Sequence, residues 1–169
     1  MTENMKNILK IRAEQLARKK KLIPDSDSFI EVVEFRLAHE HYGLELIHIR
    51  EVVLLKQLTP LPGLPGFIAG ITNIRGKIFS VVDLKYFFEL PKRERTEKTW
   101  LIILNSKQME FGVMADEIVG TRLIQTDMIH NSMATLTDIR GKYLKGITND
   151  SMAILDGAKI LEDKNMVVK

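Results

Sequence analysis

The chain contains an internal duplication, and this repeat limits its fold more than any other feature of the sequence. Residues 67–73 (FIAGITN) reappear as residues 143–149 (YLKGITN). Two shorter matches occur in the same order, and they pair Tyr42-Gly43-Leu44 with Phe111-Gly112-Val113 and Val81-Val82-Asp83 with Ile154-Leu155-Asp156. The spacings of 69 to 76 residues are too long for a stacked solenoid repeat. Because units of this size bury too little surface alone, we predict two similar units that share one core.

Short apolar segments with a period of two predict that both units consist of β-strands. Val33, Phe35 and Leu37, for example, share one face, with charged residues between them. The predicted strands cover residues 29–37, 42–46, 51–55, 67–72, 77–82, 100–104, 109–115, 118–124, 143–148 and 152–155, with short helical turns at 84–90 and 156–161. A proline-rich loop over 59–66 and a tight turn over 73–76 separate some of them. Strands this short favour barrels or a sandwich over βαβ units.

Basic residues gather in the first part of the chain. Residues 1–24 contain seven Lys or Arg and two Glu, a net charge of +5, whereas the rest holds 18 basic and 20 acidic residues, a net charge of −2. An apolar stripe predicts a helix over residues 7–22, and Pro24-Asp25-Ser26 begins a linker. We therefore treat residues 1–24 as a separate arm. Three interpretations fit it: a solvated or partner-docking helix, a membrane-surface helix, or a nucleic-acid-binding segment that lacks aromatics for base stacking.

Residues suited to catalysis or metal binding are sparse. The chain has no Cys, which excludes disulfides, thiolate metal ligands and thiol nucleophiles. We interpret His39, His41 and His48 as exposed turn histidines, and Asp116-Glu117 as a solvated loop, because adjacent strand residues point apart. Neither a glycine-rich phosphate loop nor a serine elbow occurs. We expect a protein that is not an enzyme and that has no metal and no cofactor.

A series of short motifs occurs between residues 35 and 84. Phe35-x-Leu37 leads into Tyr42-Gly43-Leu44-Glu45-Leu46 and Ile49-x-Glu51. After Thr59, the stretch from Pro65 to Gly70 continues into Asn73-Ile74-Arg75-Gly76 and then Ser80-Val81-Val82-Asp83-Leu84. With these motifs the chain resembles the CheW family of bacterial chemotaxis coupling proteins. The resemblance covers about residues 29–162.

The resemblance implies a mainly β fold with two five-stranded SH3-like barrels around a common core, to which the basic arm is added. We place the boundary between the barrels near residues 92–99. The resemblance also implies a non-catalytic adaptor that joins the cytoplasmic tip of chemoreceptors to the regulatory domain of the histidine kinase CheA. In the family, the receptor tip docks between the barrels and the kinase contacts the barrel ends. We expect a cytoplasmic protein that is recruited to membrane-associated receptor arrays, without membrane insertion and without nucleic acid.

The family's partner-binding residues are carried over by their position in the motifs. They fall on Ile49, Glu51, Leu58, Thr59, Gly70, Asn73, Arg75 and Gly76. Glu51 and Arg75 are either an ion pair beside the binding surface or two unrelated surface charges. The apolar residues of this region are either core or the desolvated centre of an interface, and this set is Ile49, Val52, Leu58 and Phe67. Gly70, Asn73 and Gly76 most simply serve backbone geometry.

Two other functions remain open. One is a CheW-like scaffold in another signalling pathway, such as pilus motility or biofilm control. The other is an oligonucleotide-binding β-barrel that uses the basic arm. The sequence does not choose between the first of these and chemotaxis, whereas the absence of a basic body disfavours the second.

Overall fold

The structure is a computed structural model, and it describes residues 6–14, 28–91, 98–131 and 139–166. Residues 6–14 are helical and every side chain in them is exposed. The predicted helix over 7–22 therefore matches the chain as far as residue 14, and the rest of it lies outside the described residues. The linker expected after Pro24 also lies outside, apart from Ser28. No helix in the described ranges is long and apolar enough to cross a membrane.

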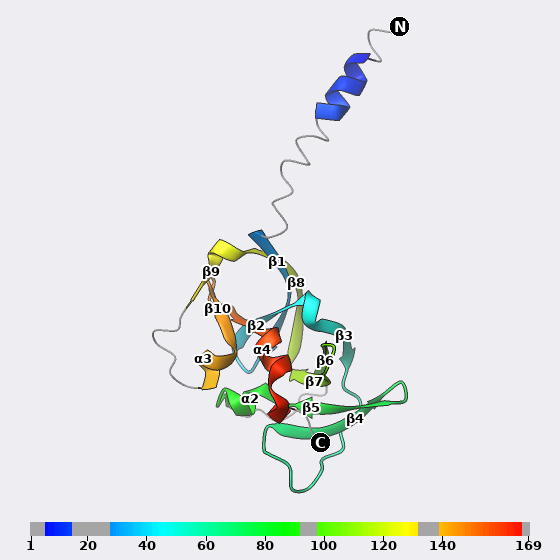
Figure 1. The fold of residues 1–169 in the computed structure, drawn as a ribbon, viewed down its shortest axis with the longest axis vertical. Coiled ribbons are helices and arrows are strands. Elements are labelled where there is room, and N and C mark those ends of the chain that lie inside the picture. Colours follow the sequence, from blue (N-terminus) through cyan, green and yellow to red (C-terminus); the bar gives the residue numbers. More distant parts are fainter. Residues whose placement is uncertain (1–5, 15–27, 92–97, 132–138, 167–169) are drawn as a thin grey trace.

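Five strands from the middle of the chain form one sheet, which we call the middle barrel (Figure 1). They are β3 (Ile49–Leu54), β4 (Ile68–Ile74), β5 (Lys77–Val82), β6 (Trp100–Asn105) and β7 (Glu110–Ala115), in the spatial order β3-β6-β7-β5-β4. The segment after β3 returns to β4, where Thr59 and Ile71 exchange backbone hydrogen bonds of 2.8 and 2.9 Å. This return closes the sheet into a barrel, because it joins the two edge strands.

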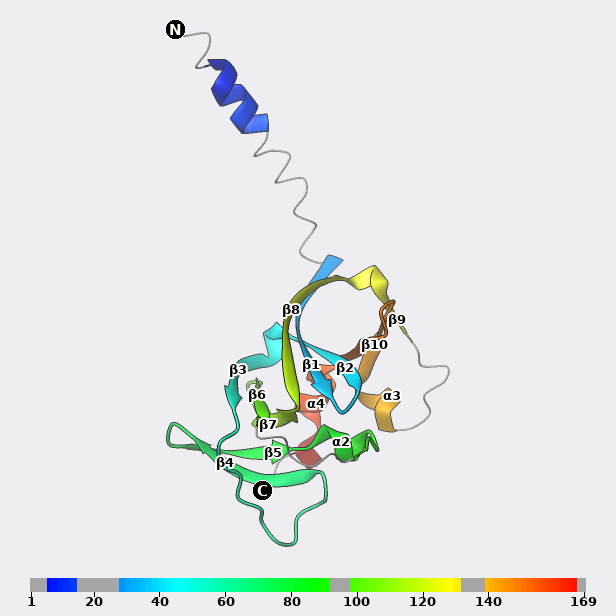
Figure 2. The same cartoon turned by 180° about the vertical axis from the view of Figure 1, so that it is seen from behind.

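The remaining strands come from both ends of the chain and form the terminal barrel. They are β1 (Phe29–Leu37), β2 (Glu40–Glu45), β8 (Glu117–Gln125), β9 (Ile129–His130), β10 (Leu144–Thr148) and β11 (Ala153–Leu155), in the order β8-β1-β2-β11-β10-β9. The 3-10 turn η3 (Thr126–Met128) joins one edge strand, β8, to the other, β9. In Figures 1 and 2 the terminal barrel lies above the middle barrel. The expected mainly β fold of two SH3-like barrels is confirmed, although the two-residue strand β9 makes the terminal sheet six-stranded.

The boundary predicted near residues 92–99 does not coincide with a passage between the barrels. Residues 92–97 lie outside the described ranges, but β5 before them and β6 after them belong to the same sheet. The chain instead changes barrels at the 3-10 turn η2 (Leu46–His48) and again at Asp116. The reason is that the hairpin β1–β2 completes the barrel of the second half, so the two units interleave.

The internal duplication predicted from the sequence is confirmed in the strand pairing. β5 runs parallel to β7, with Val81 opposite Gly112, and β11 runs parallel to β2, with Ile154 opposite Gly43. These four residues belong to the matched segments. Each unit then continues into a short helix, α2 (Leu84–Phe87) or α4 (Gly157–Glu162), whose first turn is capped by the repeated aspartate, Asp83 or Asp156.

The expected shared core lies between the barrels. The largest cluster of buried side chains draws on both sheets and on both capped helices, and it includes Phe35, Tyr42, Leu84, Phe88, Leu104, Phe111, Leu155 and Ile160. Phe87 packs against this cluster, and its ring lies 4.4 Å from that of Phe67 and 5.7 Å from that of Tyr143. Phe67 and Tyr143 are equivalent positions of the repeat. The repeated units thus meet face to face across one aromatic ring. The last described elements, α3 (Ile139–Tyr143) and η4 (Lys164–Met166), flank this core.

Candidate partner-binding surface

All eight residues predicted to bind partners lie on the middle barrel. They occupy β3, the segment that returns to β4, β4 itself and the turn between β4 and β5, and they are Ile49, Glu51, Leu58, Thr59, Gly70, Asn73, Arg75 and Gly76. The topology therefore brings together motifs that are up to 27 residues apart in sequence. Their environments differ, however, and the differences separate side chains that could touch a partner from those that shape the surface.

Glu51 and Arg75 form an ion pair, with 3.1 Å between the Arg75 Nη1 and Glu51 Oε2 atoms. In the β4–β5 hairpin, Ile74 pairs with Lys77 and leaves Arg75-Gly76 as a two-residue turn with φ values of 52° and 85°. These left-handed values are those of a type I′ turn, which matches the twist of the flanking strands. The Asn73 side chain accepts the Gly76 N–H at 2.8 Å and fixes the turn. The Arg75 side chain is 78% exposed, so the pair sits at the surface.

A second group of ion pairs adjoins this one and was not predicted. Glu110 on β7 accepts hydrogen bonds from Arg50 on β3 and from Lys77 on β5. Desolvation favours a higher pKa for Glu110, but the hydrogen bonds and charges of Lys77 and Arg50 outweigh it and hold that pKa below its ordinary value. Because Arg50 precedes Glu51 and Lys77 follows the Arg75 turn, we treat these residues as one charged face. It consists of Arg50, Glu51, Arg75, Lys77 and Glu110.

Gly70 and Thr59 hold the barrel closed. Gly70 has a φ of 149°, and a Cβ atom placed on it would lie 2.3 Å from the Thr59 carbonyl oxygen. No side chain fits there, since real Cβ atoms do not approach an oxygen so closely. Gly70 is thus a structural residue that lets the return segment reach β4, whereas the Thr59 side chain is exposed.

The apolar residues near this surface are half-buried rather than free. Ile49, Val52 and Phe67 pack against the shared core, and Leu58 packs against the smaller cluster inside the middle barrel. Of the two interpretations given above for these four residues, the one as core residues therefore accounts for these contacts. Sequence reasoning also missed several large aliphatic side chains of the barrels that are open to solvent, among them Ile47, Ile78, Val119 and Leu123. Val119 and Leu123 lie on the same solvent-facing side of β8, where exposed residues alternate with less exposed ones. The sequence contains this alternation.

The histidines and acidic residues that were considered as metal ligands or catalytic groups make structural contacts or lie in turns. His39 is exposed in the β1–β2 turn, as expected, but His41 lies on β2 with its Nδ1 2.9 Å from a carboxylate oxygen of the buried Glu34. Asp116 is not in a solvated loop, because it accepts a hydrogen bond from the buried Lys85. The prediction was wrong here because Lys85 is 31 residues away in sequence. Among the described residues, no group of three or more His, Asp or Glu side chains could hold a metal ion.

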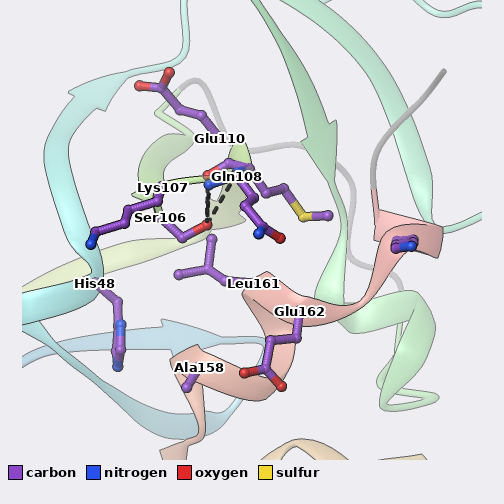
Figure 3. A pocket seen from close by; sticks show the side chains of 10 residues that line it. His48, Ser106, Lys107, Gln108, Glu110, Ala158, Leu161 and Glu162 are labelled. Atoms are coloured by element: carbon purple, nitrogen blue, oxygen red, sulfur yellow. Dashed lines mark hydrogen bonds between the residues drawn. The ribbon is translucent and has the colours of Figure 1, made fainter.

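A cavity of about 680 Å³ opens between η2, the β6–β7 loop and α4 (Figure 3). His48, Ser106, Glu110 and Leu161 are among its lining residues. The Ser106 hydroxyl accepts the backbone N–H groups of Gln108 and Met109 at 3.3 and 3.1 Å, so it stabilises the loop.

Comparisons with known proteins agree with this architecture. The model of the CheW-like domain family matches residues 31–165. The chain is 25% identical to the chemotaxis protein CheW of Treponema pallidum, over 83% of this chain and 87% of that one. It is 33% identical to the protein FrzA of Myxococcus xanthus, over 76% of this chain and 82% of that one.

The fold has a relative of known structure. The scaffolding protein TtCheW from Thermoanaerobacter tengcongensis superposes with a TM-score of 0.68 and 32% identity, covering 75% of this chain and 88% of that one. The match spans most of both chains, so the two-barrel arrangement as a whole is shared rather than one barrel alone.

Proposed function

The chain belongs to the family of CheW-like domains, and from that premise we propose that it is a non-catalytic adaptor in a chemosensory signalling complex. It joins the cytoplasmic tips of chemoreceptors to the regulatory domain of the histidine kinase CheA. It works in the cytoplasm, where it is recruited to membrane-associated receptor arrays. Relatives named as chemotaxis and scaffolding proteins support this role over most of the chain.

One observation carries the proposal: two chemically different surfaces sit on two barrels that share a core. The middle barrel presents the charged face, with Arg75 78% exposed. The terminal barrel presents the aliphatic side chains of β8, with Leu123 64% exposed. A rigid body with a charged and an apolar surface can hold two partners at a fixed separation. Their binding is coupled when both partners prefer the same joint arrangement.

The eight predicted residues divide into two groups under this proposal. Glu51, Arg75 and Thr59 contact a partner directly, because their side chains reach the surface. Gly70, Asn73 and Gly76 give the surface its shape through the barrel closure and the hairpin turn. Ile49 and Leu58 contribute the half-buried apolar rim.

Co-sedimentation of the full chain with a receptor-tip fragment and the CheA regulatory domain tests the proposal. We expect a ternary complex in which the kinase domain sediments with the receptor only when the adaptor is present. A matched chain that lacks residues 1–24 should behave alike, because the two surfaces lie on the barrels. Failure to retain either partner from a host that contains both would contradict the adaptor function.

A second candidate is a CheW-like scaffold in a pathway other than chemotaxis, because FrzA is a relative that is not named as a chemotaxis protein. At 33% that relative is more identical to this chain than the compared chemotaxis protein of Treponema pallidum, at 25%. Both candidates use the same surfaces, and they differ in the partners. Identification of the host kinase that co-purifies with the chain distinguishes them, since a chemotaxis adaptor retains the kinase of the chemoreceptors.

A further inference from the structure

Lys85 is a buried cation at the junction of the two barrels. It lies on α2, directly after the β4–β5 hairpin of the middle barrel, and it is only 8% exposed. Its Nζ donates a hydrogen bond of 2.7 Å to the Oδ1 of Asp116. Burial of an ammonium group costs free energy unless a paired carboxylate compensates for it. The Lys85–Asp116 pair therefore differs from an ordinary solvated ion pair at the surface, and its position suggests a specific role.

Asp116 stands where the chain leaves the middle barrel for the terminal barrel. β7 ends at Ala115 and β8 begins at Glu117. The second carboxylate oxygen of Asp116 accepts the Ala38 N–H at 2.7 Å, and its own backbone N–H donates to the Arg36 carbonyl oxygen at 2.9 Å. Ala38 lies in the β1–β2 turn of the terminal barrel. One carboxylate thus fastens the first hairpin of the terminal barrel to the helix of the middle barrel.

The duplicated unit carries this device only once. Counting from the repeated aspartates Asp83 and Asp156, the position of Lys85 corresponds to Ala158 on α4. Counting from the matched strands β7 and β2, the position of Asp116 corresponds to Ile47, which is 81% exposed. The equivalent positions at the other passage between the barrels therefore hold neither a cation nor a carboxylate. The pair is therefore not part of the repeated pattern.

Lys85 is buried and the Asp116 side chain is 28% exposed, so the pair is partly desolvated. Desolvation offsets much of the attraction within such a pair, which therefore adds little net stability but constrains the geometry of the groups that it joins. We propose that Lys85 and Asp116 are positioning residues that set the relative orientation of the two barrels. They thereby set the angle at which the charged face and the β8 surface are presented. The consequence for partner coupling rests on the proposed adaptor function, whereas the control of orientation does not.

The absence of Cys allows a direct measurement of the orientation. Cysteines introduced for Ile78 on β5 and Thr121 on β8 place one spin label on each barrel at exposed sites. Pulsed electron resonance then gives the distribution of label distances. We expect Lys85→Met and Asp116→Asn each to shift and broaden this distribution, while near-ultraviolet dichroism shows that both barrels remain packed. Asn keeps an oxygen for the Ala38 N–H and removes only the charge.

Lys145→Met is the matched control, because it removes a Lys–Glu pair (Lys145 with Glu45) that lies within the terminal barrel. Its distance distribution should equal that of the parent chain. Unchanged distributions in both test variants would overturn the proposal. Loss of folding in both would also overturn it, because the pair would then be a stability element rather than an orienting one.

A second measurement links the orientation to function. In unlabelled Lys85→Met, the affinity for each partner alone should stay the same, whereas the effect of one partner on the affinity for the other should fall roughly 5-fold or more. Equal coupling in the variant and the parent chain would contradict the functional part. Failure of the chain to bind either partner would count against the adaptor function alone, since the distance measurement needs no partner.

Discussion

Arg75 shows how a single residue can matter for binding without mattering for stability. Its left-handed φ of 52° aims the side chain out of the β4–β5 turn and toward Glu51, yet the guanidinium remains largely in water. Exposed ion pairs contribute about 0–1 kcal/mol. We expect Glu51→Arg and Arg75→Glu each to weaken assembly with receptor and kinase in co-sedimentation, while the melting temperature by circular dichroism stays nearly unchanged.

The double variant Glu51→Arg/Arg75→Glu is the control for this prediction. It restores a pair of opposite charges with reversed polarity, so it separates the role of the pair from that of the individual charges. Recovery of assembly would indicate that the pair orients the surface, and continued loss would indicate that a partner reads the charges. A large drop in melting temperature in either single variant would show that the pair is structural.

Gly70 represents the opposite case, a residue of the same motif that acts on the fold. A Cβ atom at this position would meet the Thr59 carbonyl oxygen at 2.3 Å, and the φ of 149° is unfavourable for any other residue. We expect Gly70→Ala to lower the free energy of unfolding by at least about 1–3 kcal/mol in urea titration. Gly76→Ala is the matched comparison, because it has a φ of 85° but open space around the Cβ position. An equal or smaller loss at Gly70 would mean that the steric contact is relieved easily.

The sequence predicted the turn over residues 73–76 well because the environment of that turn is local. Asn73, Arg75 and Gly76 are adjacent, so a four-residue pattern contains the whole turn. Lys85 and Asp116 are 31 residues apart, and Arg50 and Glu110 are 60 apart. No local pattern reports such a contact, because it depends on how strands distant in sequence are ordered in the sheet.

At the scale of elements, Glu110 joins three strands of the middle barrel. Its carboxylate on β7 binds Arg50 on β3 and Lys77 on β5, and its pKa is held below the ordinary value near 4.5 by these two cations against the opposing effect of desolvation. A depressed pKa in the folded state stabilises the protein above the unfolded pKa, and this contribution disappears as the pH falls through the folded pKa. We therefore expect the Glu110→Gln variant to lose less stability than the parent chain between neutral pH and about pH 3.

Urea titrations across this pH range measure the effect. Arg50→Met and Lys77→Met should reduce the acid sensitivity in the same direction, because each removes one of the cations that lowers the Glu110 pKa. Parallel pH profiles for Glu110→Gln and the parent chain would show that the cluster does not contribute to acid stability. The cluster would then be only a part of the charged face.

The edges of strands were predicted less well than the strands themselves, and β3 shows why. The alternation suggested a start near Glu51, but the strand begins at Ile49. A bulge at Arg50 interrupts the register, since Ile49 pairs with Leu104 and Glu51 with Ile103. An extra residue shifts the side chains by one position and conceals the period of two. The same device recurs in β8, where Val119 is the extra residue between Ile118 and Gly120.

At the scale of the whole molecule, the duplication was predictable and its connectivity was not. Apolar spacing and the repeated Gly-Ile-Thr-Asn segment indicate two units with one core, as found. The charged stretch near residues 92–99 suggested a boundary, because loops between domains are commonly polar. The strands on either side nevertheless pair within one sheet. Which hairpin completes which barrel depends on contacts between distant segments, and periodicity carries no information about those.

Interleaving predicts that neither half of the chain folds alone. A fragment of residues 28–98 contains β1 and β2 without their neighbours β8 and β11, and β3 without its neighbour β6. Each barrel in it would have open edges and an uncovered core. We expect this fragment to show no cooperative unfolding by circular dichroism, and co-expression with residues 99–169 to restore it. A chain of residues 25–169 is the control, and it should unfold like the full chain because the helix at 6–14 is exposed throughout. Cooperative unfolding of the isolated fragment would mean that the hairpin β1–β2 can pair with strands of its own half. Each unit would then be stable by itself, and the shared core would not be required for either unit to fold.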